Sequence, residues 1–257
     1  QKTVADRWYD RWSVGVGLNI PRDEAQGTHV IVAGKERPAR RDGNDVCFGY
    51  TLGATWTPND RTTLGASYRS AVSHTLAGDL LIQGSGGGDT DSPGTADLNL
   101  PDIATVGLAY DITNKITAQA QATWFGWSNF EDITTTVGGT QVNQIVQDYQ
   151  DTFAFAVGLE YDHNDEWDFR AGVQFDETPT TDQFRTSRTP DGDRTWAAVG
   201  GTYTLNDSMD IDFAGTYIWI DDETINVTRN IAALPTNVSA NTEGSVGILS
   251  VGLNYKF

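Results

Sequence analysis

The chain contains few of the residues that disulfide-linked, metal-binding or nucleic-acid-binding proteins require. Its single cysteine, Cys47, excludes an internal disulfide framework and a cysteine-rich zinc or iron–sulfur cluster. Seventeen Lys and Arg stand against 35 Asp and Glu, a formal net charge of −18. A nucleic-acid partner is therefore not expected, because phosphate binding needs an excess of basic residues. Mean hydropathy is −0.40 and no run of about 18 apolar residues occurs, so the sequence predicts no transmembrane helix.

Aromatic residues and glycine are abundant by contrast, and apolar residues recur at every second position. The chain has 8 Trp, 9 Tyr, 10 Phe and 27 Gly. From 153 to 161, for example, Phe, Phe, Val, Leu and Tyr alternate with Ala, Ala, Gly and Glu. This period is typical of β-strands, in which successive side chains point to opposite faces. The pattern predicts about ten strands, at residues 10–20, 46–56, 61–81, 101–110, 115–129, 149–161, 166–178, 194–205, 208–221 and 244–257.

The connections between these strands alternate in length. Short ones fall at 57–60, 111–114, 162–165 and 206–207, and long ones at 21–45, 82–100, 130–148, 179–193 and 222–243. Short turns on one side and long loops on the other are typical of outer-membrane barrels. We therefore predict an all-β fold, an antiparallel transmembrane β-barrel. A soluble sandwich is the alternative, but the aromatic residues near strand ends favour a barrel with interfacial girdles.

Several phrases resemble the FadL family of outer-membrane transporters of long-chain fatty acids and other hydrophobic compounds, and they occur in that family's order. They are residues 59–61 (NDR), 64–70 (LGASYRS), 100–102 (LPD), 124–130 (WFGWSNF), 175–179 (FDETP) and 191–196 (DGDRTW). The carboxy-terminal Phe257 also resembles the signal read by the barrel insertion machinery, which is thus an expected partner.

The resemblance implies a fourteen-stranded barrel with an amino-terminal hatch, whereas this chain supplies about ten strands and no hatch motif. We therefore expect residues 1–257 to form a single barrel domain, the carboxy-terminal part of a longer barrel. The resemblance also implies passive transport in the bacterial outer membrane, with no enzymatic activity and no cofactor. Expected partners are a hydrophobic small molecule, outer-membrane lipid and lipopolysaccharide. The alternative is a structural or adhesion barrel that acts through its long acidic loops.

Candidate ligand-binding residues follow from the alternation of faces. If Tyr68 and Phe169 face lipid, Arg69 and Arg170 project inward, and Arg194 stands at the loop edge of its strand. An arginine fork suits the carboxylate of a fatty acid, and an apolar trough suits its tail. Trp196, Ile218 and Ile220 would line such a trough. Alternatively, the arginines pair inside the barrel with Asp168, Asp176, Asp193 or Asp210.

The remaining polar residues offer little chemistry. His29, His74 and His163 show no metal-ligand spacing and are interpreted as solvated, and no metal site is predicted. Cys47 has no histidine near it in sequence, which makes a nucleophilic role weak. An outer-membrane hydrolase would need an acid–base cluster at one rim, where His29 and His74 lie. Loop carboxylates such as Asp191 and Asp193 could bind Ca²⁺, but they lack the spacing of a calcium loop.

Overall fold

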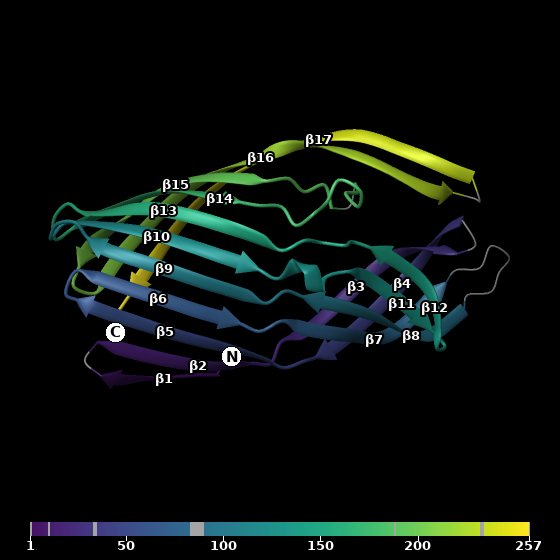
Figure 1. Ribbon diagram of the computed structural model, residues 1–257, viewed down its shortest axis with the longest axis horizontal. Helices are drawn as coiled ribbons and strands as arrows, with labels where there is room; N and C mark the ends of the chain where they lie inside the picture. Colours follow the sequence, from purple (N-terminus) through teal and green to yellow (C-terminus); the bar gives the residue numbers. More distant parts are fainter. Residues whose placement is uncertain are drawn as a thin grey trace.

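The computed structural model describes residues 2–9, 11–32, 35–82, 90–187, 189–231 and 234–256, and nearly all of them lie in antiparallel strands. Two sheets account for the fold (Figure 1). Eleven strands form what we call the wall sheet: β1 (Lys2–Tyr9), β2 (Trp12–Asn19), β5 (Gly49–Asn59), β6 (Thr62–Arg69), β9 (Ile103–Asp111), β10 (Ile116–Phe125), β13 (Thr152–Asp162), β14 (Trp167–Asp176), β15 (Arg194–Asn206), β16 (Met209–Ile231) and β17 (Leu234–Tyr255), neighbours in that order.

The other six strands form the outer sheet, and they come from the long connections of the wall. They are β3 (Arg22–Val32), β4 (Lys35–Val46), β7 (Val72–Ile82), β8 (Thr90–Leu100), β11 (Asp132–Val137) and β12 (Thr140–Val146). Their order is β12-β11-β8-β7-β4-β3, so successive hairpins pair edge to edge. Figure 1 shows this sheet beyond one end of the wall strands.

Each passage between the two sheets is a break in strand structure. The breaks include residues 20–21, 47–48, 70–71 and 101–102. Pro21 and Pro101 stand in two of them, and proline interrupts a ladder because it has no backbone N–H to donate. A 3-10 turn at Trp127–Asn129 fills the longer break between β10 and β11. Among the described residues, no helix has the length and apolarity to cross a membrane.

The antiparallel, all-β prediction is confirmed, with three differences of detail. The wall has eleven strands because β1, expected outside the strands, pairs with β2 from Lys2↔Leu18 to Tyr9↔Trp12. The strand expected at 61–81 is divided into β6 and β7, which belong to different sheets. Three long connections expected as loops (21–45, 82–100 and 130–148) contain strands, and a fourth (222–243) extends the β16–β17 hairpin.

These differences share a physical cause. Hairpins in the connections are held by backbone hydrogen bonds, which need no apolar alternation, so the pattern that finds wall strands misses them. The β11–β12 turn illustrates this: Gly138 and Gly139 have φ of 58° and 79°. Two residues at positive φ are what a type I′ hairpin turn requires.

The wall sheet is open, since β1 and β17 are its edge strands and no pairing between them occurs among the described residues. The last strands curl behind the first ones in Figure 1, which gives the sheet the curvature of a barrel wall. This curvature separates a convex face from a concave face, which we call the lumen face. Phe257, the expected insertion signal, lies outside the described residues.

Candidate functional site: the lumen face of the wall

The convex face of the wall is apolar and exposed. Cross-strand register keeps apolar residues together: Val157 pairs with Val173, which pairs with Ala197. Val157 is 57% exposed and Leu249 is 90% exposed. A soluble sandwich would bury these side chains in a core, whereas a membrane barrel presents them to lipid.

Aromatic pairs mark one end of this apolar face, next to the short turns. Trp12 stacks on Trp56 with ring centroids 5.2 Å apart, and Trp167 stacks on Tyr203 at 4.5 Å. At the other end of the wall, on β16, the rings of Tyr217 and Trp219 lie 4.7 Å apart. Aromatic rings at both ends of an apolar band are typical of the membrane–water interfaces.

The lumen face is made of small and uncharged side chains in its middle. A cavity of about 620 Å³, which we call the lumen cavity, lies against this part of the wall. Glycine and alanine line much of it, together with Gln119, Gln121, Gln174, Trp196 and Ile248. Small side chains leave space for a small molecule, and the glutamine amides supply a limited number of polar groups within it.

A polar ladder crosses the lumen face near the short turns. Gln119 donates to Glu160 (3.3 Å), and Arg170 Nε lies 3.0 Å from Glu160 Oε1. Arg170 also donates to Thr202 (3.0 Å), which in turn donates to Asp212 (2.6 Å). Asn254 completes the row at 2.6 Å from the other Asp212 oxygen. The ladder thus links six neighbouring strands of the wall, β10 and β13 to β17, and the charge of Arg170 is already paired.

At the opposite end of the lumen face, near the outer sheet, lies a second hollow that we call the rim pocket. It holds about 450 Å³, and Phe125, Trp127 and Tyr149 supply its aromatic side. Arg194 supplies its cation, paired with Asp176 (3.3 Å) and with Asp191. The pocket therefore combines aromatic surface with a guanidinium whose charge two carboxylates balance.

The rim pocket lies next to the lumen cavity along β14 and β15. Asp176 and Arg194 line the pocket, and Gln174 and Trp196, two residues further along the same strands and on the same face, line the cavity. The indole Nε1 of Trp196 is buried and has no hydrogen-bond partner among the described groups. The two hollows therefore form a path down the lumen face along β14 and β15.

The connection from 177 to 193 is anchored at the outer end of this path. Arg185, only 2% exposed, pairs with Asp182 (2.5 Å) and with Glu223 of β16 (3.1 Å), and donates to the Asp191 carbonyl (2.8 Å). Thr178 donates to Asp191 Oδ2 (2.8 Å). Arg185 lies in the connection expected at 179–193 and was not among the predicted site residues. Asp182 and Arg185 are three residues apart, and this spacing could have indicated their ion pair. The ion pair with Glu223 could not have been predicted in this way, because Glu223 is distant in sequence.

Four of the six predicted site residues come together. Trp196 pairs with Ile218 and Arg194 with Ile220, all on the lumen face of β15 and β16. Ile218 is buried and Ile220 is half-buried. Arg170 stands apart at the polar ladder. Arg69 lies at the outer end of β6 and is exposed, and no described side chain places a carboxylate within ion-pair distance of it.

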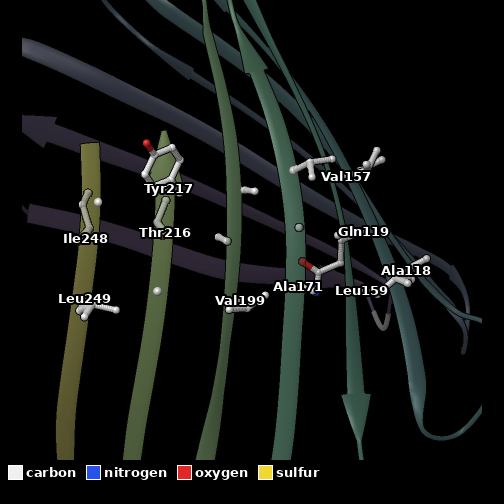
Figure 2. A pocket seen from close by; sticks show the side chains of 18 of the residues that line it. Ala118, Gln119, Val157, Leu159, Ala171, Val199, Thr216, Tyr217, Ile248 and Leu249 are labelled. Atoms are coloured by element: carbon white, nitrogen blue, oxygen red, sulfur yellow. The ribbon is translucent and has the colours of Figure 1, made fainter. Parts of the chain in front are cut away.

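A hollow of about 1350 Å³, larger than the lumen cavity and the rim pocket, does not belong to this path. Figure 2 shows Val199, Tyr217 and Leu249 on three neighbouring strands of its lining, with Val157 and Leu159 further round. These side chains belong to the apolar convex face by register, and Val199 is 65% exposed. We assign this hollow to the lipid-facing surface, because its exposed lining is apolar almost throughout.

Two expectations about histidines need correction. His74, expected to be solvated, is 1% exposed and lies beside Asp45 and Cys47. His29 lies in strand β3 instead of in a loop, and its side chain is outside the described part. His163 is exposed in a turn. No group of three or more potential ligands arranged for a metal ion occurs among the described residues.

Comparison with known proteins identifies the class. All 257 residues match the model of the family described as "Outer membrane protein transport protein (OMPP1/FadL/TodX)". The chain therefore belongs to the FadL/TodX family of outer-membrane β-barrel proteins. The family is one of transport proteins and not of enzymes, and its description gives no support to an adhesion role.

Individual relatives agree with this assignment. The chain is 26% identical over 233 residues to the long-chain fatty acid transport protein of Escherichia coli K12, covering 85% of this chain and 50% of that one. It superposes on a FadL homologue of Pseudomonas aeruginosa with a TM-score of 0.86 at 24% identity, covering 98% and 66% of the two chains. For the toluene transporter TodX of Pseudomonas putida the TM-score is 0.67 at 16% identity, covering 98% and 67%. The chain spans about half the length of the curated relatives it matches.

Proposed function

We propose that the protein carries hydrophobic small molecules across the outer membrane, passively, along the lumen face of its wall. The observation that carries this proposal is the placement of the rim pocket and the lumen cavity one after the other along the same face of β14 and β15. A ligand would meet aromatic side chains first and then a stretch lined mostly by glycine, alanine and glutamine. Such a path solvates an apolar molecule without holding it tightly, because few polar groups fix its orientation.

Long-chain fatty acids are the ligand class we favour, and Arg69 is the residue that would distinguish them from neutral hydrocarbons. Arg170 and Arg194 already have carboxylate partners. Arg69 is exposed at the outer end of the lumen face without one among the described side chains. An arginine fork can accept a ligand carboxylate at that position with two hydrogen bonds. Trp196, Ile218 and Ile220 would contact the tail.

Ligand binding to the purified full-length protein tests this assignment. Hydrogen bonds to charged groups contribute about 1.5–3 kcal/mol, so Arg69→Ala should weaken oleate binding by about tenfold or more. Toluene binding should not change, because toluene has no charge to lose. Arg61→Ala, which removes an exposed arginine in a short turn, is the matched control and should leave both ligands unaffected. Equal losses of oleate and toluene binding in Arg69→Ala would argue against a carboxylate site there.

We further infer that residues 1–257 form one part of a longer barrel. The two open edges of the wall sheet support this, since exposed strand edges recruit further strands. The intact mass of the mature protein tests it: a mass well above 28.0 kDa is expected, and a mass of 28.0 kDa would contradict it. The other proposed partners are outer-membrane lipid, lipopolysaccharide at the outer end, and the insertion machinery through Phe257.

A further inference from the structure

Three side chains, those of Asp45, Cys47 and His74, meet at the junction of the two sheets. Cys47 Sγ lies 3.3 Å from His74 Nε2, and His74 Nδ1 lies 3.2 Å from Asp45 Oδ2. The thiol thus contacts one ring nitrogen of the imidazole, and the carboxylate contacts the other. His74 is fully buried, whereas Cys47 is partly exposed.

Strand register explains this meeting. Strands β4 and β7 pair up to Asn44↔Ala77, and three more steps in the same register bring Cys47 opposite His74. Cys47 stands in the break between β4 and β5, on the same side as Gly49. Phe48, which lies between them, points to the convex face and is 78% exposed. Cys47 therefore faces inward at the outer end of the lumen face.

The order of the three groups is that of an activated nucleophile. Asp45 can accept the Nδ1 proton of His74, and in that tautomer Nε2 carries the lone pair that can take the proton of the thiol. Asp45 is itself held, because its Oδ2 also accepts the backbone N–H of Thr75 at 3.2 Å. The imidazolium formed by proton transfer would lie between two negative groups, Asp45 and the Cys47 thiolate.

Two other charged groups lie near the cluster. Asp97 of β8 accepts from Thr75 Oγ1 at 2.9 Å, and Thr75 points to the face opposite His74. Arg22, at the start of β3, is opposite Val46 in the register and is exposed. Val72 and Leu76 flank His74 on its own face and are buried. The cluster is thus polar on one side and apolar on the other.

We propose that Cys47, with His74 and Asp45, is a nucleophilic modification site for hydrophobic α,β-unsaturated carbonyl compounds. The thiolate adds to the β-carbon and forms a carbon–sulfur bond, while the carbon–carbon π bond breaks. Its electron pair moves to the α-carbon, which receives the proton that His74 took from the thiol. The step needs no oxidant and no leaving group, and it does not depend on the transport function.

Conjugate addition fits the cluster better than acyl transfer does. An acyl group would need donors placed around a tetrahedral oxyanion, in addition to a nucleophile and a base. Addition to an activated double bond needs one nucleophile and one proton donor, and the cluster supplies both. The apolar neighbours Val72 and Leu76 favour a ligand with hydrocarbon character.

The test measures how fast N-ethylmaleimide modifies the folded full-length protein between pH 5.5 and 8.5, with the Cys47 peptide followed by mass spectrometry. An ordinary thiol has a pKa near 8.5, so its rate rises about tenfold per pH unit below that value. With an imidazolium partner, the rate should change little from pH 6.5 upward. At pH 6 it should exceed that of the denatured protein by about tenfold, since greater thiolate population outweighs its lower nucleophilicity. N-ethylsuccinimide, which lacks the double bond, should give no adduct.

Variants separate activation of the Cys47 thiol by His74 from the contribution of His74 to packing. His74→Gln should restore the steep pH profile of an ordinary thiol. Because His74 is buried, Asp45→Asn provides a second, milder variant and should shift the profile to higher pH. Asp97→Asn removes a carboxylate from the other face of the same sheet and should leave the profile unchanged. A wild-type rate that rises tenfold per unit up to pH 8.5, or identical profiles for Asp45→Asn and Asp97→Asn, would overturn the proposal.

Discussion

The wall sheet and the outer sheet are both antiparallel, yet they are stabilised in different ways. In the wall, register aligns apolar side chains on one face and small or polar ones on the other, as in the pairs Val173↔Ala197 and Gln174↔Trp196. In the outer sheet, β11 reads Asp-Ile-Thr-Thr-Thr-Val and has no apolar alternation. Lipid therefore stabilises only the wall, and the β11–β12 hairpin of the outer sheet depends mainly on its backbone ladder and its turn.

The hairpin β16–β17 contains this difference within two strands. Residues 211 to 219 of β16 alternate Ile, Phe, Gly, Tyr and Trp with Asp, Ala, Thr and Ile. The register then shifts between Ile220 and Glu223, and beyond it the paired residues are mostly polar. The shift therefore marks the point where the hairpin leaves the apolar band.

The largest effect is expected from a charge on the convex face of the wall. Val173→Arg places a guanidinium in the middle of the lipid-facing band and should lower the free energy of unfolding by about 2–4 kcal/mol. Gln174→Arg, one residue on but facing the lumen, should have a much smaller effect. Urea unfolding in lipid vesicles measures both, and equal losses would place Val173 away from lipid.

A smaller effect is expected where aromatic rings cover a wall glycine. A Cβ on Gly201 would lie 2.5 Å from the Asp168 carbonyl oxygen and 2.8 Å from Phe213 Cζ. Gly201→Ala should therefore cost about 1–3 kcal/mol by overpacking. At Gly65 a Cβ would meet nothing within 4 Å, so Gly65→Ala serves as the control. The same unfolding assay should show a loss for the first variant and none for the second.

In the outer sheet, a turn substitution should act locally. Gly139 has φ of 79°, and an alanine there costs about 1 kcal/mol. Hydrogen exchange should increase in β11 and β12 while the wall strands keep their protection. Increased exchange that extended into β10 or β13 would mean that the two sheets unfold together.

The smallest effect is expected from the polar ladder. The Arg170 side chain is 48% exposed, so its pairing with Glu160 is partly screened by water. Arg170→Ala should cost at most about 1 kcal/mol, and less at high salt. Unfolding in low and high salt measures this, and a loss of several kcal/mol that salt leaves unchanged would show that the ladder is effectively buried.

The part of the fold that could be predicted from the sequence is the part in contact with lipid. Alternation located β13 and β14 well, because an exposed apolar face and a lumen face impose period 2. It could not locate β3, β4, β8, β11 or β12, which lack that pattern. The break at Ser70 and Ala71 was also missed, because apolar residues continue past it through Val72 and Leu76.

The site was predictable to a similar extent. The alternation of faces along each strand placed Arg170 and Trp196 on the lumen face. In the structure, the register between β15 and β16 puts Trp196 opposite Ile218. The alternation of faces does not say which side chains pair. It therefore left two interpretations of Arg170 and Arg194 open: binding of a ligand carboxylate, or ion pairs inside the barrel. The Cys47–His74 contact depends on the pairing of β4 with β7, and β4 was expected to be a loop.

The most direct test of the account compares two adjacent alanines of β15 that face opposite ways. Ala198 lines the lumen cavity between Gly172 and Thr216, whereas Ala197 lies between Val173 and Tyr217 on the convex face. Oleate uptake should be measured in cells that produce the full-length protein with Ala198→Trp or Ala197→Trp at equal levels. If ligands move along the lumen face, Ala198→Trp should lower uptake severalfold and Ala197→Trp should not. Equal uptake by both variants would contradict a path along the lumen face.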